Sequence, residues 1–254
     1  MLKTKAKVWL RRRCAAWGKI DKSRLTQPGV RVLMYHDVED VASNIYSVST
    51  GMFEDQLKYL KDNFEIVSLR QAYEFLTGQK ELKNTVIAVS MDDGRECIYY
   101  NAFPLLKKNN VPGCVFLTTA DKGIVTKDQV KEMRAAGIEF GGHTRTHCLL
   151  SRAPLEQMKE EIVGCKADLE AVLSESIEFF AYPYGLRRHY NQLSRQIVQE
   201  AGYKCAFSAI NGINYPGCEL FDLKRTKIER DDSLESFKKI VNGALDCWSI
   251  FDSI

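Results

Sequence analysis

The sequence lacks several features that mark specialised classes of protein. No apolar run approaches the roughly 18–20 residues that a helix needs to span a bilayer. The eight cysteines include no C-x-x-C pair and are scattered along 254 residues, a chain too long to need disulfide staples. Cys114 and Cys205 stand inside apolar runs, which is typical of reduced core cysteines. We therefore expect a globular protein with free thiols in the cytoplasm.

The N-terminal segment also lacks the apolar stretch of a secretory signal, because three arginines follow Val8-Trp9-Leu10 directly. Residues 1–24 hold nine Lys or Arg and one Asp, a net charge of +8. With +3 for the whole chain, residues 25–254 carry −5, so we expect no nucleic-acid partner. Tryptophans and cations on one amphipathic helix are typical of a peripheral membrane contact, here on the inner face. A basic first helix packed on the domain is the alternative.

Apolar segments of strand type alternate with segments of helical period after residue 25. The expected strands are Arg31–Tyr35, Glu65–Leu69, Thr85–Met91, Cys114–Thr118, Ile138–Gly141, Ile177–Tyr182, Lys204–Ser208 and Leu223–Ile228. The expected helices are Thr50–Asn63, Leu69–Leu76, Glu96–Lys108, Lys127–Ala136, Leu155–Leu173, Asn191–Ala201 and Leu234–Leu245. This alternation predicts a single α/β domain over residues 25–254, with parallel strands buried on both faces. At this length a (β/α) barrel, complete or missing a strand, is the natural closure, and an open doubly wound sheet is the alternative.

Reactive side chains fall just past the ends of four expected strands. They are His36, the pair Asp92 and Asp93, the pair His143 and His147, and Tyr184 with His189. The carboxyl ends of parallel strands share one face, where active sites of such folds form. We therefore expect these four segments to converge on one pocket.

Asp92-Asp93-Gly94 places two carboxylates at the end of an apolar strand, a costly arrangement that a divalent metal would offset. Alone, it is more simply interpreted as a cap for the helix that begins near Glu96. In Gly142-His143-Thr144-Arg145-Thr146-His147, two imidazoles four positions apart can reach one ion. They otherwise suit an ordinary polar loop. Together, the two motifs predict a catalytic metal site with two His and one Asp ligand and open positions for water and substrate.

Tyr182-Pro183-Tyr184-Gly185 predicts a rigid turn that aims a ring and a backbone N–H into the pocket, with an ordinary strand-exit turn as the alternative. Three arginines flank these motifs and are candidates for contacts with substrate phosphates. They are Arg145, Arg187 and Arg188.

The motifs S-M-D-D-G, H-T-R-T-H and Y-P-Y-G, in this order, resemble those of the NodB-homology polysaccharide deacetylases, carbohydrate esterase family four. The resemblance covers roughly residues 30 to 230 and implies a distorted (β/α) barrel of about seven strands, TIM-like in form. It implies that Asp93, His143 and His147 bind the metal, usually Zn²⁺, with Co²⁺, Ni²⁺, Mn²⁺ and Fe²⁺ as alternatives. It also implies that Asp92 is the general base and that the backbone N–H of Tyr184 binds the oxyanion. Substrate contacts are expected from Pro183, Gly185, Arg145 and Arg187.

Two departures from the family pattern affect the catalytic assignments. Ala181 stands where many members carry an arginine that tunes the base, and no histidine follows His189 to supply the usual C-terminal acid. Tyr35-His36-Asp37 instead resembles the Met-Tyr-His element of the branch that deacetylates exopolysaccharides. On that resemblance, His36 is the expected general acid, oriented by Asp37 or Asp92, with His189 in reserve.

The expected function is metal-dependent removal of an N-acetyl or similar N-acyl group from an amino sugar, free or linked to a nucleotide or lipid. Because the thiols are expected to be free and residues 1–24 do not resemble an export signal, we expect this step on the cytosolic side, during assembly of a surface polysaccharide or lipid-linked glycan. A deformylase or deacylase of a lipid-linked sugar is the nearest alternative. Two more distant ones are a non-haem iron enzyme, because two His and one carboxylate suit that metal, and an inactive carbohydrate-binding module.

Overall fold

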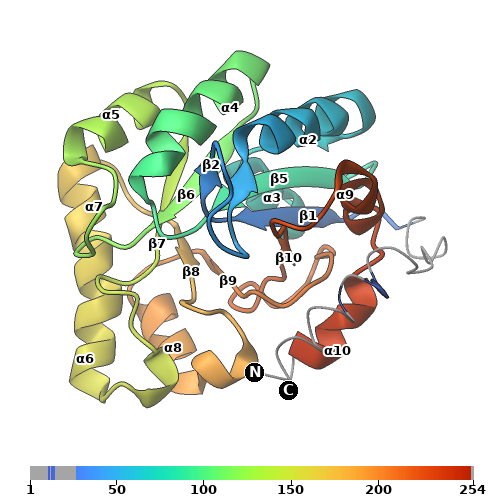
Figure 1. Ribbon diagram of the computed structural model, residues 1–254. Coiled ribbons are helices and arrows are strands. Elements are labelled where there is room, and N and C mark those ends of the chain that lie inside the picture. Colours follow the sequence, from blue (N-terminus) through green and yellow to red (C-terminus); the bar gives the residue numbers. More distant parts are fainter. Residues whose placement is uncertain (1–10, 12, 15–26, 253–254) are drawn as a thin grey trace.

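The computed structural model describes residues 11, 13, 14 and 27–252 (Figure 1). Its strands are β1 (Val30–Tyr35), β2 (Val38–Glu39), β3 (Val48–Ser49), β4 (Glu65–Ile66), β5 (Val86–Met91), β6 (Gly113–Leu117), β7 (Glu139–Gly142), β8 (Phe179–Ala181), β9 (Cys205–Phe207) and β10 (Thr226–Lys227). Its α-helices are α2 (Thr50–Asn63), α3 (Leu69–Leu76), α4 (Phe103–Asn109), α5 (Lys127–Ala135), α6 (Leu155–Lys159), α7 (Cys165–Leu173), α8 (Gln192–Glu200), α9 (Leu234–Val241) and α10 (Ser249–Asp252). Most of the basic segment 1–24 lies outside the described residues.

The main sheet is a distorted barrel of parallel strands. Its strands follow the order β10-β1-β5-β6-β7-β8-β9, and β4 pairs with the lower part of β5. A parallel bridge between Phe207 and Leu223 joins the end of β9 to the segment before β10, which brings the two sheet edges together. All eight predicted strands are present, five of them shorter than predicted, and the barrel prediction is confirmed. The two-residue strands β2 and β3 form a separate small sheet that the sequence pattern did not indicate.

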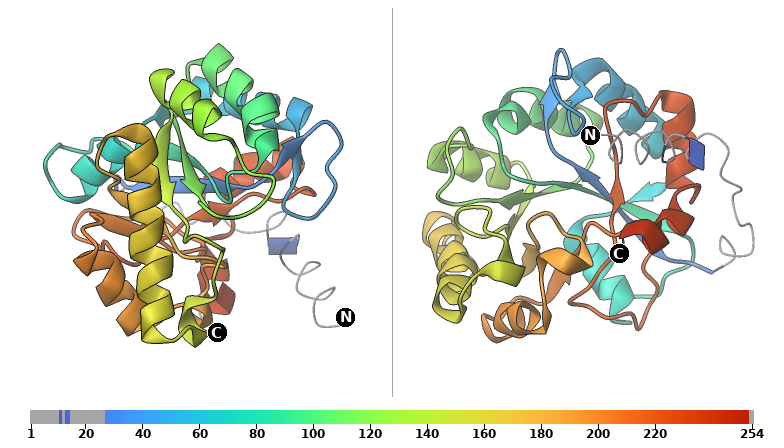
Figure 2. Two further views of the ribbon diagram at one scale, coloured as in Figure 1. Left: turned by 90° about the vertical axis from the view of Figure 1, so that its left-hand side faces the viewer. Right: turned by 60° about the horizontal axis from the view of Figure 1, so that its bottom comes forward.

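Both faces of this sheet are buried, which explains why its strands are almost entirely apolar. Alternate residues of β1 pack in different layers: Leu33 and Tyr35 contact the layer under the helices, and Val32 contacts the layer inside the barrel. Helix α3 contributes Leu69 and Leu76 to that inner layer. Helices α2 and α4 to α9 form the outer ring around the strands (Figures 1 and 2), whereas the short α10 lies beside Asn211, which donates to Asp252.

Helix ends follow their local signals, whereas two long helices are interrupted. Ser68 and Thr126 form capping boxes with the residue three positions later, and these start α3 and α5 as predicted. The expected helix 96–108 begins with a π-helical turn, η1 (Ile98–Ala102). The expected helix 155–173 is likewise divided into α6, the π-helical turn η3 (Glu160–Gly164) and α7. Both π-helical turns are single-turn interruptions, which the prediction of one continuous helix in each case did not include.

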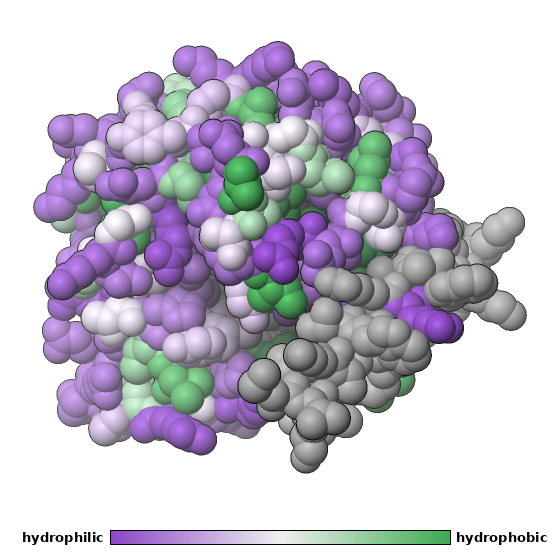
Figure 3. Space-filling model, in the orientation of Figure 1, coloured by the Kyte–Doolittle hydropathy of each residue, from purple (hydrophilic) through white to green (hydrophobic). Residues whose placement is uncertain are grey.

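On the face drawn in Figure 3, apolar side chains form small separate patches among hydrophilic ones. Within the described part of the chain, no helix is both long and apolar enough to cross a membrane. All eight cysteines lie among the described residues, and each is a free thiol.

Candidate metal and active site

The four predicted strand ends meet at one pocket of about 550 Å³, a size typical of small-molecule sites. The predicted residues that line it are His36, Asp92, Asp93, His143, His147, Tyr184, Arg188 and His189. Main-chain hydrogen bonds hold the strand ends in place: Asp92 N–H donates to Tyr35, and His143 N–H donates to Leu117. The prediction that separate segments converge at the carboxyl edge of the sheet is therefore confirmed.

Asp93, His143 and His147 form the one group of possible metal ligands found among the described residues, with ligand atoms within 4.8 Å of one another. Asp93 Oδ1 lies 3.6 Å from Nε2 of each histidine. This oxygen is buried and has no hydrogen-bond partner in the described structure, an arrangement that is costly unless a cation or a proton faces it.

The histidines present the right lone pairs for metal binding. His143 Nδ1 lies 2.7 Å from the carbonyl oxygen of Ala181, which can only accept, so Nδ1 carries the proton and Nε2 is left as a ligand. Burial, followed by the neighbouring His143, lowers the pKa of His147 and favours its neutral, ligating form. The three residues therefore fit a divalent cation with imidazole and carboxylate ligands.

Backbone strain is concentrated at this site. The described residues include six non-glycine residues with positive φ, and four belong to the site motifs: Asp93 at 70°, Thr144 at 65°, His147 at 56° and Tyr184 at 60°. Such conformations cost on the order of 1–3 kcal/mol each and persist only where surrounding contacts enforce them. Gly94 is required next to them, since a Cβ there would lie 2.1 Å from a Leu117 methyl.

Asp92 is held by an arginine that the sequence analysis did not identify. Arg225, immediately before β10, donates to both carboxylate oxygens of Asp92 at 2.6 and 2.8 Å, and both side chains are buried. Burial raises the pKa of Asp92, but Arg225 and His143 outweigh it and lower that pKa from 3.8 to about 2. Asp92 therefore remains ionised, and the interpretation of the Asp pair as a helix cap is wrong.

Two further contacts hold the guanidinium of Arg225 against Asp92. Its Nε donates to the Ser208 carbonyl at 2.8 Å, and its guanidinium lies 5.3 Å from the centre of the Phe116 ring. Three points of attachment fix its orientation.

Both candidate acids line the pocket, but their surroundings differ. Burial lowers the pKa of His36, and the charges of Asp92 and Asp93 oppose that effect. Burial also lowers the pKa of His189, and there the charge of Arg188 adds to the effect. Of the two histidines, only His36 has a pKa that the charges of Asp92 and Asp93 raise. A raised pKa favours the protonated form, and this supports His36 as the acid.

The predicted orientation of His36 by Asp37 is wrong. Asp37 accepts instead from the Asn44 amide and the Cys97 thiol, while His36 Nδ1 is buried without a partner among the described residues. The His36 ring lies 5.1 Å from that of Tyr46, and this contact contributes to its position.

Tyr184 stands at the mouth of the pocket, 54% exposed, with its ring 4.5 Å from that of His147. Its positive φ follows from the tight turn in which Gly185 N–H donates to the Pro183 carbonyl at 2.7 Å. A Cβ on Gly185 would lie 2.5 Å from Ala209 N, so only glycine fits. Pro183 and Gly185 thus shape the turn rather than line the pocket, and the Tyr184 N–H makes no hydrogen bond within the described part of the chain.

Comparisons with known proteins identify the family of this chain. A family model described as polysaccharide deacetylase matches residues 79–206. The poly-beta-1,6-N-acetyl-D-glucosamine N-deacetylase of Staphylococcus aureus is 31% identical over 218 residues, which cover 78% of this chain and 73% of that protein. The chain belongs to the polysaccharide deacetylase family. It is therefore a hydrolase acting on an amide bond.

Solved structures of this family share the fold. A deacetylase of Streptococcus pyogenes, PplD in complex with acetate, matches with a TM-score of 0.77 and 26% identity, covering 85% of this chain and 99% of that chain. IcaB from Ammonifex degensii matches with a TM-score of 0.76 and 26% identity, covering 86% and 98%. The putative polysaccharide deacetylase YxkH of Bacillus subtilis is 25% identical over 227 residues, 88% of this chain and 78% of that protein.

Two of the expected substrate contacts do not reach the pocket of this deacetylase. Arg145 turns outward and pairs with Asp168 and Glu160 at 3.0 and 2.9 Å. Arg187 pairs with Asp222 at 2.8 Å. Neither arginine lines the pocket, because each guanidinium forms an ion pair with a carboxylate outside it. Arg188 does line it and makes no ion pair with any described residue.

Arg11, from the basic segment, also lines the pocket. It is 5% exposed and donates to both oxygens of Asp232, at 2.8 and 3.0 Å, and to the Lys227 carbonyl at 2.8 Å. Glu229 lies 3.2 Å from the same guanidinium. This part of the segment packs on the domain, so Arg11 is not available to a membrane surface.

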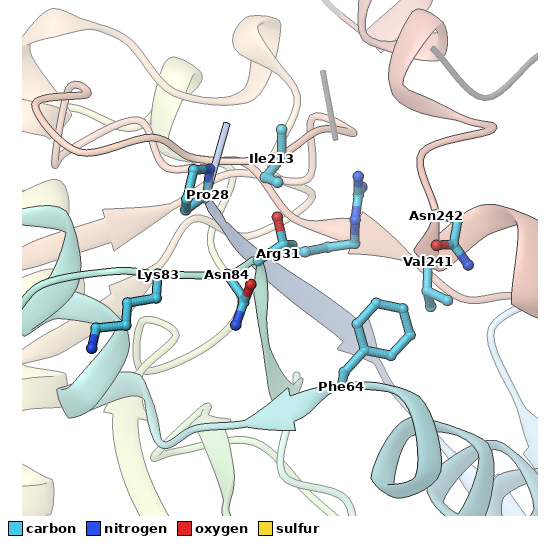
Figure 4. Close-up of a pocket in the computed structure, with 9 residues that line it drawn as sticks. Pro28, Arg31, Phe64, Lys83, Asn84, Ile213, Val241 and Asn242 are labelled. Atoms are coloured by element: carbon cyan, nitrogen blue, oxygen red, sulfur yellow. The ribbon is translucent and has the colours of Figure 1, made fainter. Parts of the chain in front are cut away.

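A second, smaller cavity of about 160 Å³ lies near the opposite ends of the strands, beside the start of β1 (Figure 4). Its lining includes Arg31 and Lys83, whose side chains point in different directions. Arg31 is neutralised by Asp246, at 2.7 and 2.9 Å. This cavity offers no group of catalytic residues and is not the active site.

Proposed function

We propose that this chain is a metal-dependent deacetylase that hydrolyses the N-acetyl group of an amino sugar in a surface glycan or its precursor. The observation that carries the proposal is the buried Asp93 Oδ1, which has no hydrogen-bond partner among the described residues and lies 3.6 Å from two imidazole nitrogens. A bound divalent cation supplies polarisation of the amide carbonyl and acidification of a water molecule. Zn²⁺ suits two nitrogens and one oxygen with an open position.

The remaining groups divide the proton transfers among them. Asp92, ionised by Arg225, accepts the proton of the attacking water as general base. The Tyr184 N–H faces the oxyanion, and one such donor typically contributes about 2.7–4 kcal/mol to lowering the barrier. His36 gives a proton to the departing amine.

Two features support the choice of substrate. Relatives of known name include the poly-beta-1,6-N-acetyl-D-glucosamine N-deacetylase of Staphylococcus aureus, which favours an N-acetylglucosamine unit for this chain. Arg188 lines the pocket and has no ion-pair partner among the described residues, so it suits a phosphate near the sugar, as in a lipid-linked or nucleotide-linked precursor. We propose that the reaction takes place on the cytosolic side of the membrane, because such phosphate-bearing precursors would be its substrates and because the cysteines are free thiols.

The test is release of amine from N-acetylated and N-formylated glucosamine substrates, presented free, as oligomers, nucleotide-linked and lipid-linked, with and without a chelator. The proposal expects chelator-sensitive release, fastest with the phosphate-bearing N-acetylated substrates. If amine were released from the oligomers alone, the proposal of a phosphate-bearing precursor as substrate would be wrong. Faster release of formate than of acetate would favour the deformylase. Oxygen consumption with Fe²⁺ would identify a non-haem iron enzyme, whereas an inert protein that binds sugar would be a binding module.

We retain peripheral membrane contact as a proposal for the basic segment, with Arg11 excluded from it. Its cations other than Arg11 and Arg13 would attract anionic lipid at roughly 1 kcal/mol each. Sedimentation with anionic vesicles, weakened by added salt, is the expected result. Failure to sediment at low salt would leave packing on the domain as the role of the segment.

A further inference from the structure

The segment that joins the two histidine ligands is held from outside the pocket. Thr144 and His147 both have left-handed backbone conformations, which residues with a Cβ rarely adopt. The intervening Arg145 and Thr146 must therefore be fixed by other contacts if the two imidazoles are to face Asp93. These contacts come from the helical stretch that contains η3 and α7.

Glu161, in η3, supplies the most direct of them. Its side chain is buried, and Oε2 accepts from the backbone N–H groups of Arg145 and Thr146, both at 2.9 Å. Oε1 accepts from the Thr146 hydroxyl at 2.5 Å. All three donors belong to the ligand segment, and no ion pair joins Glu161 to a described Lys or Arg. Both oxygens of the carboxylate therefore accept hydrogen bonds from Arg145 and Thr146, the two residues that follow Thr144 and precede His147.

The π-helical turn places this carboxylate and leaves room beside it. Arg145 crosses the helix at Gly164, where an added Cβ would lie 2.8 Å from Arg145 Cδ. Beyond that point Arg145 reaches Glu160 and Asp168. Asp168 also accepts from Thr119 at 2.7 Å, close to the end of β6. The arginine expected to bind substrate therefore ties the ligand segment to the helix.

We infer that Glu161 is a positioning residue for the metal ligands, which sets the distance and direction between His143 and His147. Glu161 is outside the Asp93 group, and donors of the ligand segment occupy both its oxygens, so it is not a fourth ligand. The inference rests on the proposed metal site. It predicts that weakening this clamp lowers metal affinity without removing a ligand, as loss of groups behind metal ligands typically does, by about 10- to 100-fold.

The test compares Glu161→Gln with Glu156→Gln in the full chain. In the first variant the introduced amide keeps the shape of the carboxylate but turns one acceptor into a donor that faces an N–H or a hydroxyl. Glu156 is 85% exposed at its side chain and pairs only with Lys159 among the described residues, so its variant is the control. Zn²⁺ dissociation constants are measured by chelator competition, and the visible spectrum of the Co²⁺ form reports ligand geometry.

Glu161→Gln should bind Zn²⁺ about 10- to 100-fold more weakly, with an altered Co²⁺ spectrum and with turnover recovering as Zn²⁺ is raised. Glu156→Gln should match the wild type. Wild-type affinity and spectrum in Glu161→Gln would overturn the inference, whereas a wild-type protein that binds no metal would overturn the proposed function instead.

If Glu161→Gln does not fold, Thr146→Val removes the hydroxyl donor alone and Thr146→Ser restores it. Weaker Zn²⁺ binding in the valine variant, rescued in the serine variant, supports the role of Glu161. Equal binding in both contradicts it.

Discussion

Replacing Arg225 by Met should expose how strongly the buried guanidinium controls Asp92. In the wild type Arg225 and His143 overcome burial and keep the pKa of Asp92 at about 2, against an ordinary value of 3.8. Loss of such a neighbouring cation typically raises a carboxyl pKa by about 1–3 units, so without the guanidinium burial moves the pKa of Asp92 up from about 2 to above its ordinary value. The acidic limb of kcat/KM should therefore move to higher pH, because Asp92 accepts protons as a base only when ionised.

The same change should destabilise the fold. Leaving one buried charge unpaired typically costs about 3–5 kcal/mol. Linkage gives a compatible figure: a pKa lowered from 3.8 to about 2 corresponds to between about 2 and 3 kcal/mol. Since the folded pKa is depressed, this stability is present above pH 4 and is lost as the pH falls through about 2. In the variant the raised pKa lets Asp92 take up a proton, so the difference from wild type should shrink between pH 7 and pH 4.

The assays are amine release as a function of pH, and urea unfolding of the metal-free protein at pH 7 and pH 4. Arg225→Lys keeps the charge and loses the paired geometry, so it should fall between wild type and Arg225→Met. Arg230→Met, at a partly exposed arginine in the following loop, is the matched control. An unchanged acidic limb together with unchanged unfolding at pH 7 in Arg225→Met would refute the reasoning.

Three further predictions separate the roles in the pocket. Asp92→Asn should retain bound metal and lose turnover, whereas His143→Ala should lose metal; stoichiometric metal in His143→Ala, measured by elemental analysis, would contradict the ligand assignment. His36→Ala should slow turnover by on the order of 10²–10⁴ and abolish the alkaline limb of the pH profile with metal content unchanged, and the same behaviour in His189→Ala alone would exchange the two roles. Arg11→Ala should lower the free energy of unfolding by about 3–5 kcal/mol and raise KM, because it leaves Asp232 and Glu229 buried beside the pocket without their cation. Unfolding and KM equal to those of the wild type would contradict a role of Arg11 in the wall of the pocket.

The order of residues along the chain was sufficient to predict the strands, the barrel and the place of the active site. Apolar strands that alternate with helical periods predicted eight parallel strands and the barrel, since burial on both faces imposes an apolar pattern on each strand. The rule that parallel strands end at one edge predicted that His36, Asp92, His143 and Tyr184 would meet, because it needs no knowledge of which strands are neighbours.

Only the tertiary structure decided which charged groups serve the site. Asp92 and Arg225 are 133 positions apart, and nothing local distinguishes Arg225 from the other 35 Lys and Arg residues. Its role follows from the pairing of β10 with β1, which sets it beside the end of β5. Arg145 and Arg187, by contrast, were predicted as substrate contacts from their place in the motifs. In the structure they form ion pairs with Asp168 and Asp222, which keep both guanidinium groups out of the pocket. Motifs fix which groups lie at a strand end, whereas the partner of each charge depends on contacts between distant segments that no local pattern records.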